Sequence, residues 1–141
     1  METELRFEEW MGTVPQSLSS DPLWKSKYYQ YAMYLYDMAW LDCELLKRDY
    51  RGKEILRQLI QSAGSVCANM EEAYGRGVGT PDYVRILRIS LGEARETKGH
   101  YLRSRHVLPI VTIEKRLQLT DQVISALVGT RSSHRRKLQR S

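Results

Sequence analysis

The sequence lacks any apolar run of the roughly 18 to 20 residues that a membrane-spanning helix needs. Its most apolar stretch, residues 28–46, is interrupted by Gln30, Asp37, Asp42 and Glu44. The first residues are acidic and lack the basic and apolar regions of a secretory signal peptide. These absences predict a cytoplasmic protein without a membrane partner.

Cysteine and histidine are scarce, with two cysteines and three histidines in the chain. Cys43 and Cys67 have neither metal-ligand spacing nor a disulfide-rich context, and their apolar neighbours predict reduced core residues. No histidine lies in a His-Glu-x-x-His motif, as in many zinc sites, or in a Glu-x-x-His motif, as in di-iron bundles. The glycine run at 75–79 follows a helical pattern rather than a strand, unlike a dinucleotide-binding loop. We therefore predict no catalytic residues, no metal and no cofactor.

The prolines and glycines divide the chain into four long stretches with helical periodicity. The predicted helices span about residues 22–48, 53–75, 81–106 and 112–129. Asp21-Pro22 and Thr80-Pro81 have the cap-then-proline order of a helix start, and Thr112 is a cap for the last helix.

The length and the 42% share of hydrophobic residues suit one domain with a single core. We predict an all-α fold, an antiparallel up-down-up-down four-helix bundle, over residues 21–130. Residues 1–20 are predicted to form an N-terminal arm with a short amphipathic segment, and residues 131–141 a basic C-terminal tail.

The helix predicted at 53–75 has an apolar face and an unusual polar face. The polar face comprises Gln58, Gln61, Ser62, Ser65, Asn69, Glu72 and Arg76. Exposed helix faces usually carry Lys and Glu, whereas short amides and hydroxyls let another helix approach closely and hydrogen-bond. We expect Asn69, Glu72 and Arg76 to join this helix to the start of the next one or to a neighbouring subunit. A weakly charged, solvated surface is the alternative.

The helix predicted at 22–48 is apolar nearly all the way round, and most of its aromatic residues are tyrosines. A helix in a monomeric bundle needs only one buried face, so the other side must be covered by something else. Tyrosines suit an interface because the ring packs while the hydroxyl stays wet. We predict a homo-oligomer with Tyr31, Tyr34 and Gln61 at the subunit interface.

Positive charge is concentrated in two places. The net charge is +5, and the tail holds five basic residues and no acid, which leaves 17 basic and 17 acidic residues elsewhere. The basic tail residues are Arg131, Arg135, Arg136, Lys137 and Arg140. The second place is one face of the helix at 81–106, which carries Arg85, Arg88, Arg95 and Arg103.

Arginine-rich surfaces of this kind suit phosphate groups, so we predict that these nine residues bind nucleic acid. Two alternatives stay open. The tail can be a disordered, solubilising end, and the arginine face can be a solvated surface paired with Glu93 and Glu96.

Residues 65–76, SVCANMEEAYGR, resemble the S-[IV]-x-x-N-I-x-E-G-x-G-R signature of the four-helix-bundle 23S rRNA intervening-sequence protein family. Asn69, Glu72, Gly75 and Arg76 match position for position, and Ala73 replaces a glycine. Residues 82–92, DYVRILRISLG, are similar to the family's E-F-x-R-F-L-x-I-A-x-G. The resemblance covers roughly residues 22–128.

The resemblance implies the bundle fold and a ring-like homopentamer. The family includes the accessory variability determinant of diversity-generating retroelements, which binds a reverse transcriptase and nucleic acid through basic surface. The first hypothesis is therefore a non-enzymatic oligomeric scaffold that binds RNA. The second is an accessory factor whose main partner is a protein, such as a reverse transcriptase, and the third is an undetected enzyme. The sequence does not rank the first two.

Overall fold

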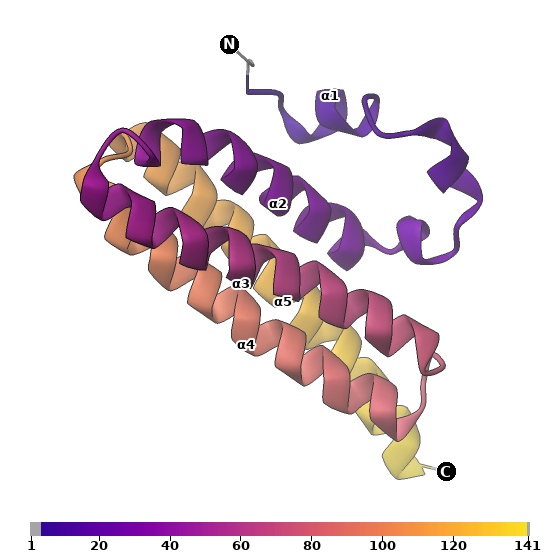
Figure 1. Ribbon diagram of the computed structural model, residues 1–141. Helices are drawn as coiled ribbons and strands as arrows, with labels where there is room; N and C mark the ends of the chain where they lie inside the picture. The colour runs from indigo at the N-terminus through magenta and orange to yellow at the C-terminus, as the bar shows by residue number, and fades with distance from the viewer. Residues whose placement is uncertain (1–3, 141) are drawn as a thin grey trace.

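The computed structural model describes residues 4–140, and within that range it contains only helices, turns and irregular connections (Figure 1). The four long helices are α2 (Lys27–Leu46), α3 (Tyr50–Gly75), α4 (Pro81–Arg103) and α5 (Ile110–Arg140). The shorter elements are α1 (Phe7–Met11) and the 3₁₀ turns η1 (Gln16–Ser20), η2 (Leu23–Lys25) and η3 (Ser104–His106). The prediction of an all-α fold is confirmed.

Each long helix packs against the next along the chain, and α5 also packs against α2. Between α3 and α4, Ser90 Oγ donates to the Val66 carbonyl over 2.8 Å and Thr97 Oγ1 donates to Ser62 Oγ over 2.9 Å. Later residues of α4 therefore meet earlier residues of α3. Small polar side chains at these contacts let the two helices approach closely.

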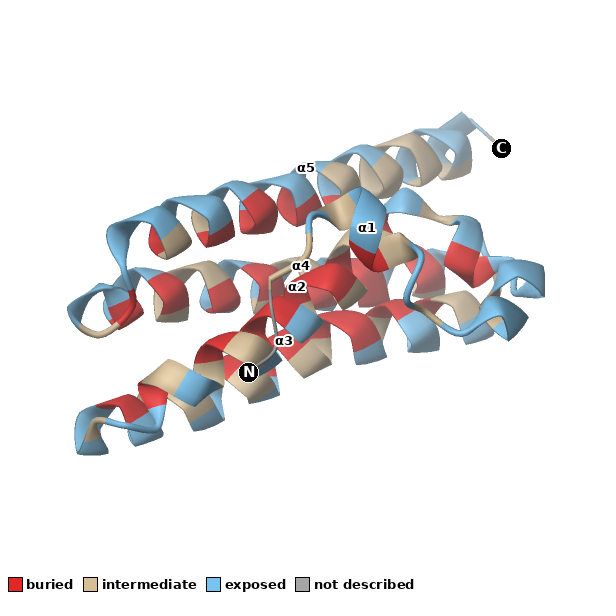
Figure 2. Cartoon of the chain, turned by 90° about the horizontal axis from the view of Figure 1, so that it is seen from above, coloured by how far each residue is buried: buried red, intermediate tan, exposed pale blue. Residues whose placement is uncertain are grey.

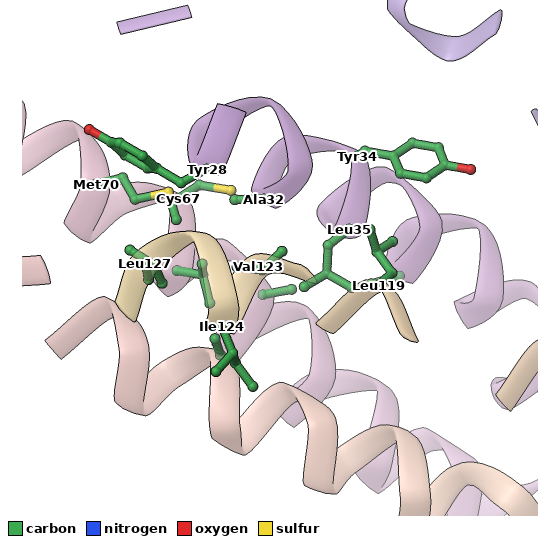
Figure 3. Close-up of a cluster of buried hydrophobic side chains, with 14 of the residues drawn as sticks. Tyr28, Ala32, Tyr34, Leu35, Cys67, Met70, Leu119, Val123, Ile124 and Leu127 are labelled. Carbon is green, nitrogen blue, oxygen red and sulfur yellow. The ribbon is translucent and has the colours of Figure 1, made fainter. Parts of the chain in front are cut away.

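The core lies among the four long helices, where the buried positions face inward (Figure 2). Figure 3 shows one part of it, with Ala32 and Leu35 of α2 beside Leu119 and Val123 of α5. The face of α4 that points into the core is buried except for Leu91, which is partly buried. Its buried members are Tyr83, Leu87, Ser90, Ala94, Thr97 and Tyr101.

The first two long helices begin at other residues than predicted. Asp21-Pro22 opens the 3₁₀ turn η2, in which Asp21 accepts a hydrogen bond from the Leu23 amide, and α2 begins only at Lys27 because Ser26 is extended. Helix α3 begins at Tyr50, where the Asp49 side chain caps the Arg51 amide over 2.8 Å.

Gly52 was predicted to lie in the connection but lies within α3, against the end of α2. A Cβ added at Gly52 would come 2.1 Å from the Leu46 carbonyl oxygen, so only glycine fits there. At the next connection, Gly77 and Gly79 have φ of 107° and 87°, the left-handed region that glycine adopts without strain. Thr80 then caps α4 as predicted, with its hydroxyl accepting from the Tyr83 amide.

The last helix is longer at both ends than predicted. Helix α5 begins at Ile110, so Thr112 lies inside it, and it runs to Arg140 rather than ending near Gly129. The His134 ring meets the Tyr83 ring edge-on at 4.9 Å, and Leu138 packs against the core. These contacts hold residues 131–140 as an ordered extension of α5, so the alternative of a disordered tail is wrong for the described residues.

Among residues 4–140, no helix has the length and hydropathy to span a membrane.

Candidate nucleic-acid interface

A buried ion cluster that the sequence did not reveal connects α2, α4 and α5. The Arg116 guanidinium of α5 donates to both carboxylate oxygens of Asp42 over 2.7 and 3.0 Å. Tyr101 Oη donates to the same carboxylate over 2.7 Å, and Glu4 binds Arg116 from the N-terminal arm. The cluster satisfies the charges in its interior, so we assign it a structural role.

The contacts within this cluster shift the pKa values of Glu4 and Tyr101 in opposite directions. Burial works against the charged form of Glu4, but its hydrogen bonds and the charges of Arg116 and Lys115 outweigh this and lower its pKa. Burial and the neighbouring Asp42 raise the pKa of Tyr101 well above its usual value. Glu4 therefore stays charged and Tyr101 stays neutral at neutral pH.

The polar face of α3 lines a groove of about 340 Å³ beside α4. Its lining comprises Gln58, Gln61, Ser62, Ser65, Glu93, Glu96, His100 and Arg103. Burial, together with the charge and hydrogen bond of Glu96, raises the pKa of Glu93. Arg103 lines the same groove, with one guanidinium nitrogen 3.0 Å from His100 Nδ1.

The signature residues of α3 make short-range contacts. Asn69 donates from its amide nitrogen to the Ser65 carbonyl of its own helix over 2.8 Å. Arg76 lies between Glu72, 3.0 Å away, and Asp82 at the start of α4, 3.4 Å away. These three charged side chains are about half exposed, so within one chain each pair contributes less than about 1 kcal/mol.

The N-terminal arm covers one side of α2 and changes the interpretation of its tyrosines. The Phe7 ring packs against Tyr31 and Tyr34 with centroids 4.8 and 5.5 Å apart. Tyr34 Oη donates to the Leu5 carbonyl, and Trp10 Nε1 donates to Asp37 over 2.8 Å. The arm thus buries Tyr34 and covers part of Tyr31, the two tyrosines that were predicted to lie at a subunit interface.

Another part of α2 stays uncovered. An apolar groove of about 700 Å³ lies between the arm and α2, lined by Leu5, Trp10, Tyr36, Met38 and Trp40 among others. The Trp40 side chain is 59% exposed and lies at 6.4 Å from the Tyr36 ring. An exposed tryptophan beside an apolar groove suits contact with another protein.

The four arginines predicted on α4 are all exposed but have different neighbours. Arg85 pairs with Asp82 at 3.4 Å, and Arg103 lies in the polar groove with the glutamates. Arg88 and Arg95 are two helical turns apart on the side nearer α5. No carboxylate in the described range pairs with Arg88, Arg95 or Arg103, and of these three Arg88 and Arg95 lie outside the groove that contains Glu93 and Glu96.

The basic end of α5 extends this positive surface. Residues Arg135, Arg136, Lys137 and Arg140 are exposed, and Arg131 is half-buried in the seam between α5 and α4. Burial and the positive charges of Arg135 and Arg88 lower the pKa of Arg131. The Tyr83 ring of α4 meets the His134 ring of α5 at 4.9 Å, so the basic end of α5 lies beside the first half of α4, which carries Arg88.

Both cysteines are free thiols. Cys67 is buried and Cys43 half-buried, and burial raises their pKa values to about 12 and about 11, so both are protonated and unreactive at neutral pH. Between residues 4 and 140, no three His, Cys, Asp or Glu side chains gather as a metal site would require.

A family model for the 23S rRNA-intervening sequence protein matches residues 25–129. The chain belongs to this family. The match confirms the resemblance found in the sequence and spans α2, α3, α4 and most of α5. The family's segment contains Arg88 and Arg95, whereas the basic end of α5 lies beyond it. No curated protein and no solved structure matches the chain.

Proposed function

We propose that this member of the 23S rRNA-intervening sequence protein family is a non-enzymatic, oligomeric scaffold that binds RNA. The subunit is an antiparallel up-down-up-down four-helix bundle, and the family resemblance favours a ring-like homopentamer. The observation that carries RNA binding is that the basic end of α5 lies beside α4, on which Arg88 and Arg95 are exposed without a carboxylate partner in the described range.

The physical basis is release of counterions from the phosphate backbone. Arg88 and Arg95 are exposed and project from a rigid helix, so only their side chains, and not the backbone, lose conformational freedom on binding. The end of α5 adds Arg135, Arg136, Lys137 and Arg140 on a second rigid helix. Contacts of this kind position RNA without reading its sequence, and several subunits in one assembly multiply them.

Assembly is supported by the apolar groove beside the exposed Trp40. Such a surface fits a neighbouring subunit, because aromatic residues are enriched at protein interfaces. We expect Trp40 of α2 to contact the neighbouring subunit, because it is exposed whereas Tyr34 is buried and Tyr31 is partly buried.

The same groove favours a second candidate function. Under this second hypothesis, the chain is an accessory protein whose main partner is another protein, such as the reverse transcriptase of a diversity-generating retroelement, and RNA contact is secondary. Trp40 would then contact that partner.

A fluorescence anisotropy titration of a labelled, structured RNA separates the two. The Arg88→Gln/Arg95→Gln variant should bind about tenfold or more weakly than the wild type, because two positive charges that face the phosphates are removed. The control is Arg48→Gln/Lys53→Gln, which removes the same charge from exposed positions near the α2–α3 turn and should bind like the wild type. Equal weakening by both variants would contradict a localised interface, and absence of RNA binding by the wild type would favour the protein partner.

A further inference from the structure

Arg116 and Arg131 lie on the same side of α5, but the charges around them differ in sign: Arg116 has carboxylate neighbours and Arg131 has positively charged neighbours. The Arg116 guanidinium donates hydrogen bonds to the carboxylates of Asp42 and Glu4. Arg131 lies farther along α5, between Leu127 and His134, which are at helical spacing from it and share its side of the helix. Its Nε atom is buried, and no residue from 4 to 140 accepts a hydrogen bond from it.

Two other arginines make the surroundings of Arg131 less favourable for its positive charge. Tyr83 meets His134 and Lys98 pairs with Asp121, so the register of the two helices brings Arg88 level with Arg131. Arg135 is one turn farther along α5. Burial and these two positive charges lower the pKa of Arg131.

A buried guanidinium donor without an acceptor costs free energy, and two nearby positive charges add to that cost. The chain supplies a carboxylate for Arg116 but, within the described range, none for Arg131. An anion from outside the chain would satisfy the donor and neutralise the cluster. The planar guanidinium fork matches the oxygens of a phosphate group, which two or three arginines can hold together.

We propose that Arg88, Arg131 and Arg135 form a phosphate-binding site in the seam between α4 and α5. The site deepens the proposed function, on which its biological use rests, by naming where a backbone phosphate of RNA is held. The ligand chemistry is a phosphate group, either free in solution or part of a nucleic acid.

Thermal unfolding with free phosphate tests the site directly. The variants are Arg131→Met, which keeps an apolar stem in the seam but removes the guanidinium, and the control Arg136→Met, which removes an exposed arginine from the other side of α5. Each protein is unfolded in sodium phosphate and in sodium chloride at equal ionic strength and pH. Phosphate should raise the Tm of the wild type and of Arg136→Met more than that of Arg131→Met.

In chloride alone, Arg131→Met should be at least as stable as the wild type, because a buried Nε donor without an acceptor is removed. An equal phosphate effect on all three proteins would overturn the site, and so would a large loss of stability of Arg131→Met in chloride. Arg88→Gln, an exposed position, provides a second variant that should fold normally and also lose most of the phosphate effect.

A short RNA distinguishes the two phosphate sources. If the RNA binds and Arg131→Met weakens it about tenfold while Arg136→Met has a smaller effect, the site holds a backbone phosphate. If the RNA binds and both variants weaken it equally, the site is overturned while the proposed function stands. If phosphate stabilises through Arg131 but no RNA binds, the site holds free phosphate and the proposed function fails.

Discussion

At the scale of single residues, Asp42 shows how a charge inside a helix bundle becomes a structural necessity. In the sequence it is one of four polar interruptions of an apolar run, and nothing marks it from Asp37 or Glu44. In the fold its side chain is 6% exposed and that of Arg116 is 3% exposed. The two residues are 74 positions apart, so no local pattern links them.

Replacing Asp42 with Ala should be strongly destabilising, because Arg116 would keep a buried charge with only Glu4 to balance it. We expect a loss of about 3–5 kcal/mol in the free energy of unfolding, measured by urea denaturation. The matched control is Asp121→Ala, which breaks the ion pair with Lys98 at a carboxylate that is 57% exposed and should cost less than about 1 kcal/mol. Similar losses for the two variants would show that the Asp42 cluster is not a buried ion pair.

At the scale of helices, the sequence predicted their number and faces better than their ends. Thr80-Pro81 was interpreted correctly because its capping is local, but the similar Asp21-Pro22 pair opens only a 3₁₀ turn. The extension of α5 depends on His134 meeting Tyr83, a contact between distant residues. The arginines of α4 were recognisable from helical spacing, whereas the buried position of Arg131 was not, since it depends on that same extension.

Gly52 is where the connection between α2 and α3 is most sensitive. Gly52→Ala would place a Cβ 2.1 Å from the Leu46 carbonyl oxygen, a backbone atom that cannot move without shifting the helix end. We expect a destabilisation of about 1–3 kcal/mol, despite the better helix propensity of alanine. Gly92→Ala in α4 is the control, because nothing lies within 4 Å of the added Cβ, and it should stabilise by up to about 1 kcal/mol. A neutral or stabilising Gly52→Ala would mean that the helix ends are farther apart than described.

At the scale of the whole molecule, assembly and RNA binding are linked through multivalency. The exposed Trp40 beside the apolar groove supports assembly. Light scattering of the wild type at micromolar concentration should give a mass several times 16.5 kDa. Trp40→Ser should lower that mass, whereas Tyr50→Ser, which removes an exposed aromatic residue outside the groove, should leave it unchanged. A monomeric wild type would contradict the oligomeric scaffold.

The salt dependence of RNA affinity tests the central claim most directly, because it reports how many phosphates the basic surface neutralises. For about four neutralised phosphates, the affinity of the wild type for a structured RNA should fall about 100-fold between 50 and 200 mM salt. The Arg88→Gln/Arg95→Gln variant should bind more weakly and with a shallower slope, by about 0.7–0.9 for each arginine–phosphate pair removed. An affinity that is independent of salt, or a slope unchanged by the two substitutions, would contradict RNA binding through the surface formed by α4 and α5.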